Sequence, residues 1–146
     1  MRLLLAATAG LVLSGCTRVL TPAQVSTAGR DELQHAYLKA RHAQEHASLV
    51  QSWSPWMSPE QYFRAIRHRA TELYTWDDQT DELVIGAQLA TGMPRDALWW
   101  SWGPPWHEDI TRYPTGEVRR WRYGGRYSGT DVTIENGTVI WWHTDE

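Results

Sequence analysis

The residues with the clearest capacity for chemistry form the sequence His-Ala-Gln-Glu-His at residues 42–46. Two histidines four apart on a helix can share a zinc ion, and a glutamate between them can activate water, as in inverted zinc-peptidase signatures. At about 100° per residue, however, His35, His42 and His46 lie opposite the apolar side of the predicted helix. A catalytic zinc also needs a third protein ligand and a shaped cavity. We therefore expect these histidines to form a solvated face, and we assign no catalytic residue and no metal ligand. Opportunistic metal binding by the histidines is the alternative.

Other arrangements that support catalysis are also missing from the sequence. No Gly-Xaa-Ser-Xaa-Gly elbow presents a serine nucleophile, and no glycine-rich phosphate loop follows a predicted strand. The acidic pairs Asp77-Asp78 and Glu108-Asp109 join neighbours in predicted loops, which does not place two carboxylates across a substrate. The sequence therefore predicts a protein that is not an enzyme and holds no cofactor.

The only cysteine, Cys16, has a different predicted chemistry. Arg2, an apolar run over residues 3–13 and the small pair Ser14-Gly15 are typical of a secretory signal peptide. With a cysteine directly after the small pair, the pattern is that of the bacterial lipobox, in which the thiol is acylated and becomes the new N-terminus. The apolar run is shorter than the roughly 20 residues of a spanning helix.

We therefore expect residues 1–15 to be a lipoprotein signal peptide and Cys16 to carry lipid, with palmitate among its acyl chains. An ordinary signal peptide or an uncleaved anchor is the alternative. Thr17 follows the cysteine in place of the aspartate that marks retention in the inner membrane. The expected location is the outer membrane, facing the periplasm of the bacterial cell envelope.

Arginines gather late in the chain, where five fall within residues 112–126 with one glutamate among them: Arg112, Arg119, Arg120, Arg122 and Arg126. In a strand, Arg120 and Arg122 share one face and Arg119 shares the other with Trp121. Arginine beside aromatic rings suits anionic lipid headgroups or an acidic protein partner. Pairing with local acids is the alternative. The net charge of -3 is too mild to indicate nucleic-acid binding.

Ten tryptophans and six tyrosines accompany a single phenylalanine, which is unusual in 146 residues. Their rings combine apolar area with one polar handle and are enriched where one end is buried and the other is wet. Trp99, Trp102 and Trp121 are expected in the core. The candidate residues for partner or lipid binding are Arg119, Arg120, Arg122, Arg126, Trp100, Trp106 and Trp142.

Helices are predicted in the first part of the chain. Residues 16–29 are interpreted as a tether, and residues 30–80 as a helical extension with helices over 30–51 and 58–74. The second helix begins with a capping box, in which Ser58 is followed by Gln61. Asp81 is expected to cap a short third helix.

A last helix is predicted from Pro94 to Trp102, where Gly103 and two prolines stop it. Strands are predicted over 110–113, 117–123, 131–135 and 139–142. Asn136-Gly137, between two apolar runs, is a strong signal for a hairpin with a type I′ turn. Helices followed by strands favour the α+β class, with an antiparallel sheet covered by helices on one face.

Four motifs in one order over residues 81–143 resemble the BamE-like (SmpA/OmlA) small outer-membrane lipoprotein domain: Gly92-Met93-Pro94, Trp102-Gly103-Pro104-Pro105, Trp121-Arg122-Tyr123 and Glu135-Asn136-Gly137-Thr138-Val139. The resemblance implies helices packed on a three-stranded antiparallel sheet over residues 81–146. It also implies a role in contacting protein and anionic lipid, because the best-known member is an accessory subunit of the outer-membrane β-barrel assembly machinery.

We therefore expect a lipid-anchored protein-interaction module for outer-membrane assembly or maintenance, with that machinery as a candidate partner. A module that stacks its tryptophan rings on peptidoglycan glycan is the alternative.

Overall fold

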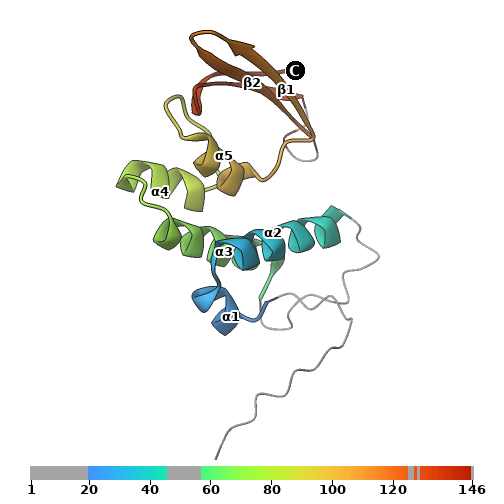
Figure 1. Cartoon of the computed structure of the whole chain (residues 1–146). Coiled ribbons are helices and arrows are strands. Elements are labelled where there is room, and N and C mark those ends of the chain that lie inside the picture. Colours follow the sequence, from blue (N-terminus) through green and yellow to red (C-terminus); the bar gives the residue numbers. More distant parts are fainter. Residues whose placement is uncertain (1–19, 46–56, 125–126, 128, 146) are drawn as a thin grey trace, which may run out of the picture.

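The computed structural model describes residues 20–45, 57–124, 127 and 129–145. Over these residues the chain forms helices first and strands afterwards, which confirms the α+β class. The helices are α1 (Pro22–Thr27), α2 (Arg30–Glu45), α3 (Pro59–Leu73), α4 (Asp78–Ile85) and α5 (Arg95–Trp102), and the strands are β1 (His107–Tyr113), β2 (Gly116–Tyr123), β3 (Thr130–Glu135) and β4 (Thr138–Thr144). Helices α4 and α5 lie between the sheet and the pair formed by α2 and α3 (Figure 1).

Local capping signals start the first helices. The predicted capping box at the start of α3 is present, since the Ser58 side chain accepts from the Gln61 N–H and the Gln61 side chain accepts from the Ser58 N–H. An equivalent box at Thr21 starts α1. Residues 22–27 of the segment interpreted as a tether are therefore helical, and the apolar side chain of Val25 is buried.

The start of α4 differs from the prediction, and the end of α5 agrees with it. The carboxylate of Asp77, and not that of Asp81, accepts from the N–H of Thr80 and caps α4. Asp81 instead lies inside the first turn of the helix. Helix α5 ends at Gly103 as predicted, with φ of 88°, a conformation that glycine adopts without a Cβ clash.

The sheet is an antiparallel meander in the order β1-β2-β3-β4. The expected count of three strands is wrong, because β1 pairs with β2 along its whole length and adds a fourth strand. The predicted hairpin is confirmed: Asn136 and Gly137 have φ of 48° and 84°, the positive values that a type I′ turn requires at both central residues.

The core joins the helical layers to one face of the sheet. The 3–4 spacing in the sequence predicts an apolar stripe on helix α2 made of Leu33, Ala36, Tyr37, Ala40, Ala47 and Val50. The first four are buried, and the last two lie outside the described residues. On the sheet, alternate residues such as Trp121, Val132 and Ile134 are buried against the helices, and their neighbours point to the opposite, more exposed face. Within the described part of the chain, no helix is long and apolar enough to cross a membrane.

Truncation of Trp121 to alanine is expected to reduce the free energy of unfolding by about 3–5 kcal/mol, because its ring is buried against the helices. The same change at Trp106, whose side chain is 75% exposed, should alter it by about 0.5 kcal/mol or less. Urea denaturation of both variants measures the difference. Equal stability of Trp121→Ala and the parent would contradict the placement of β2 in the core.

Candidate interaction surface

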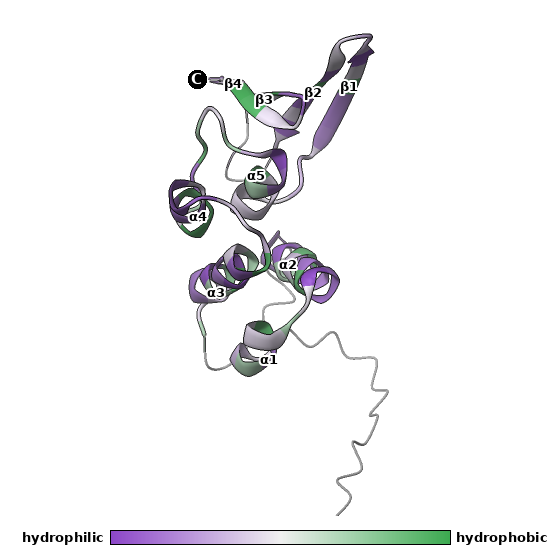
Figure 2. Cartoon of the chain, turned by 60° about the vertical axis from the view of Figure 1, so that its left-hand side comes forward, coloured by the Kyte–Doolittle hydropathy of each residue, from purple (hydrophilic) through white to green (hydrophobic). Residues whose placement is uncertain are grey.

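The two edges of the sheet differ in chemistry. Edge strands normally carry charges that prevent pairing with other chains, and β1 follows this rule with Glu108, Asp109 and Arg112. Strand β4 has no Asp, Glu, Lys or Arg and instead exposes three consecutive apolar residues. Their exposed fractions are 43% for Ile140, 55% for Trp141 and 38% for Trp142. In Figure 2, β1 is largely purple, while β4 carries a green, hydrophobic segment.

The beginning of β4 is covered by another segment of the chain. The N–H of Gly92 donates to the Val139 carbonyl over 2.8 Å, and the N–H of Val139 donates to the Met93 carbonyl over 2.9 Å. Pro94 forms an isolated bridge with Thr138. Among the described residues, no strand or bridge pairs with the outer edge of β4 beyond Val139. The uncovered edge, residues 140–144, therefore coincides with the three exposed apolar side chains.

An irregularity in β4 distributes these side chains around the edge. Ile134 faces Val139 but Thr133 faces Trp141, so Ile140 is an extra residue in the strand. Trp141 lies on the open face of the sheet, where its ring stacks on that of His143 with an interplanar angle of 7°. Trp142 is the partner of the buried Val132 and lies on the helix-facing side. The edge thus presents an indole on each face.

The arginines of β2 are largely engaged with acids of the same sheet. Arg119 forms ion pairs with Glu108 and Glu117, and Glu108 also accepts a hydrogen bond of 2.9 Å from the indole N–H of Trp121. The hydrogen bond from Arg119 holds the pKa of the Glu117 carboxyl below its ordinary value. This arrangement orders the helix-facing side of β1 and β2 and neutralises the charge of Arg119.

On the open face, Arg122 donates two hydrogen bonds of 2.8 and 3.0 Å to the Asp131 carboxylate. These hydrogen bonds lower the pKa of Asp131 and raise that of Arg122. Arg120 is exposed on the same face, and Arg126 lies outside the described residues. The pairing of Arg119 and Arg122 favours the interpretation of local ion pairs over that of a basic stripe free for anionic ligands.

The predicted tryptophans divide between surface and core. Trp106 and Trp142 are exposed, as predicted for binding residues. Trp100 is only 2% exposed, so its assignment to a binding surface is wrong. The prediction considered a single buried stripe on α5, but α5 lies between two layers, and Trp100 contacts Tyr37 and Tyr74 on the side away from the sheet.

Two further observations concern the other sequence-based candidates. His35 and His42 are exposed on α2, in agreement with a solvated face, while His46 lies outside the described residues. Across the residues with described positions, no group of three or more His, Cys, Asp or Glu side chains could hold a metal ion. Cys16 also lies outside them. Sequence reasoning missed the importance of Ile140 and Trp141, although the unbroken apolar run after the Asn136-Gly137 turn was an available signal.

Asp131→Asn is expected to lower the free energy of unfolding at neutral pH by about 1 kcal/mol or less, because the ion pair with Arg122 is partly exposed. The pKa of Asp131 is depressed in the folded state, so its contribution is complete above the unfolded value of 3.8 and is lost as the pH falls through the folded value. Urea denaturation over an acidic pH series should therefore show parent and variant converging. A difference that stays constant with pH would indicate altered packing instead of lost charge.

Comparisons with known proteins identify no relative of this chain. No family model matches the sequence, no curated protein matches it, and no solved structure matches the fold.

Proposed function

We propose that this chain is a lipid-anchored protein of the bacterial outer membrane that faces the periplasm and binds a protein partner, without catalysing a reaction, in envelope assembly or maintenance. The observation that carries the proposal is the uncovered apolar edge of β4, where Ile140, Trp141 and Trp142 are exposed side by side. The anchor rests on the lipobox at Cys16.

The edge of β4 suits a partner that adds a strand. An incoming extended segment would satisfy backbone N–H and C=O groups along residues 140–144 and would cover apolar area at the same time. Tryptophan is enriched among the residues that dominate binding energy, because its ring buries a large area. The indoles of Trp141 and Trp142 lie on opposite faces, so they could contact successive side chains of one added strand.

The partner chemistry follows from the charge of this edge. Strand β4 carries neither Asp, Glu, Lys nor Arg, and therefore favours an extended segment with alternating apolar side chains over a charged one. The resemblance of residues 81–143 to the BamE-like domain makes the β-barrel assembly machinery the first candidate partner. Anionic lipid headgroups remain a secondary ligand for Arg120, which is exposed on the open face.

Cys16→Ser is expected to move the protein from the membrane fraction to the soluble periplasmic fraction, because one acylated cysteine is the proposed anchor. Metabolic labelling with an alkyne-bearing palmitate should mark the parent and leave the variant unlabelled. A parent that takes up no label would exclude the lipid anchor and leave an ordinary signal peptide or an uncleaved anchor.

A photo-crosslinking residue in place of Ile140 is expected to capture one predominant envelope protein in living cells. Ile110 provides a matched control, because it has the same residue type and the same 43% exposure on the opposite edge strand. A crosslinker at position 110 should capture little. In a second pair of proteins the crosslinker replaces Thr144, with and without Ile140→Lys. The lysine should reduce capture by about tenfold, since the added strand would bury its charge.

Equal capture from both edges, or none from either, would contradict strand addition at β4. Retention of the parent on peptidoglycan sacculi, lost in Trp141→Ala, would support the glycan-binding alternative, since the exposed Trp141 ring stacked on His143 offers a flat platform for sugar rings.

A further inference from the structure

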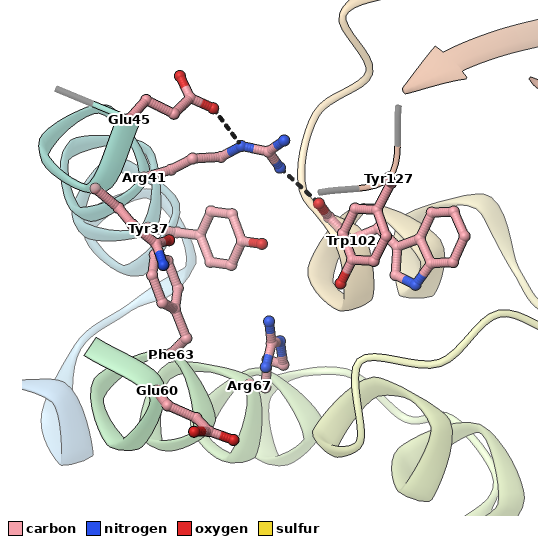
Figure 3. Close-up of a pocket in the computed structure, with 9 residues that line it drawn as sticks. Tyr37, Arg41, Glu45, Glu60, Phe63, Arg67, Trp102 and Tyr127 are labelled. Atoms are coloured by element: carbon pink, nitrogen blue, oxygen red, sulfur yellow. Dashed lines mark hydrogen bonds and ion pairs between the residues drawn. The ribbon is translucent and has the colours of Figure 1, made fainter. Parts of the chain in front are cut away.

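A pocket of about 470 Å³ opens between α2, α3, the C-terminal end of α5 and Tyr127, which lies between β2 and β3 (Figure 3). It lies on the helical side of the molecule and is separate from the uncovered edge of β4. Its described lining combines two arginines, Arg41 and Arg67, with the aromatic residues Tyr37, Phe63, Trp102 and Tyr127. Positive charge and flat apolar walls are thus present in one cavity.

Arg67 is the feature that points to a ligand. Arg67 is only 7% exposed, and its Nε atom has no hydrogen-bond acceptor among the described residues. Among the described residues, no carboxylate forms an ion pair with it, and its guanidinium is directed into the pocket in Figure 3. Burying a guanidinium without an anionic partner is unfavourable. A bound anion would supply the missing charge and accept hydrogen bonds from the guanidinium.

The other polar groups of the pocket suit the same kind of ligand. Arg41 is held at the rim by Glu45 at 3.1 Å and by the Trp102 carbonyl at 2.6 Å. Burial raises the pKa of Tyr37, while the charges of Arg67 and Arg41 act to lower it. The Tyr37 hydroxyl therefore stays protonated and can donate a hydrogen bond to an oxyanion.

The apolar walls suit a ring. The rings of Trp102 and Tyr127 stack with centroids 4.1 Å apart, and the indole N–H of Trp102 donates to the Ala87 carbonyl over 3.0 Å. Phe63 of α3 forms another wall, and its ring centroid lies 5.9 Å from the guanidinium carbon of Arg67. These aromatic side chains give the pocket apolar walls beside the two arginines.

We propose that this pocket binds a small molecule with a flat ring that bears one oxyanion, either a carboxylate or a phosphate. The oxyanion contacts Arg67 and the Tyr37 hydroxyl, with Arg41 at the rim, and the ring packs against Phe63 and the pair of Trp102 and Tyr127. The carboxylates of Glu45 and Glu60 at the rim disfavour ligands with additional negative groups near the opening.

Titration calorimetry of the full chain with phenyl phosphate and with benzoate tests this proposal and distinguishes the two oxyanions. Inorganic phosphate and benzyl alcohol serve as probes with only the charge or only the ring. We expect binding of at least one of the charged ring compounds, and at least tenfold weaker binding of both partial probes. No binding of either charged ring compound at millimolar concentration would overturn the proposal.

Three variants locate the binding. Arg67→Met and Arg41→Gln should each weaken binding by about tenfold or more, while Arg120→Gln, on the open face of the sheet, should leave affinity within about twofold. Arg67→Met should also keep or raise the melting temperature, because it replaces a buried guanidinium that has no carboxylate partner among the described residues with an apolar side chain of similar length. Equal loss in Arg120→Gln would overturn the assignment, and Arg41→Gln decides alone if Arg67→Met does not fold.

Discussion

The position of α5 between two layers is the constraint on which the rest of the structure depends. Its C-terminus contacts both layers at once: the Trp102 carbonyl accepts from Arg41 of α2, and the Gly103 carbonyl accepts from the Tyr123 hydroxyl of β2. A Cβ at Gly103 would lie 2.1 Å from the Arg41 Nη1 atom. A side chain at position 103 would displace the end of the Arg41 side chain that bonds the Trp102 carbonyl, and the positive φ of Gly103 is the conformation that favours glycine.

This arrangement accounts for the large aromatic content. A helix as short as α5 exposes little of its own surface to water when it is covered on both sides, and wide rings fill the space between layers efficiently. Tyr37 of α2 contacts Trp99 and Trp100 of α5. On the side of the sheet, Trp102 of α5 contacts Tyr123 of β2. Many of the aromatic residues thus join the layers, while the exposed rings lie beside the two edge strands, with Trp106 and Tyr113 at β1 and Trp141 and Trp142 in β4.

The features that sequence reasoning predicted correctly are local ones. The capping box at Ser58, the stop at Gly103 and the Asn136-Gly137 turn each depend on a few consecutive residues. The errors concern what lies next to an element in space. Trp100 was placed on the surface because the sequence does not reveal the layer that covers the second side of α5. The count of three strands followed the resemblance, although the sequence pattern itself predicts a strand over residues 110–113, the region of β1.

The candidate sites show the same division. The exposure of Trp106 and Trp142 followed from patterns in the sequence, but the pocket could not be predicted, because Arg41, Arg67 and Trp102 come from three separate elements. No periodicity marks Arg67 as buried, since an arginine on a polar helix is ordinarily solvated. Its burial is visible only once α2 and α5 are placed over α3.

The segment from Gly92 to Pro94 has a consequence for the selectivity of the β4 edge. By occupying the outer side of Thr138 and Val139, it leaves only residues 140–144 open, a length of roughly 17 Å at about 3.4 Å per residue. This segment blocks pairing of a further strand with Thr138 and Val139. An added strand can therefore pair with β4 only beyond Val139, along the part of the strand that exposes Ile140, Trp141 and Trp142.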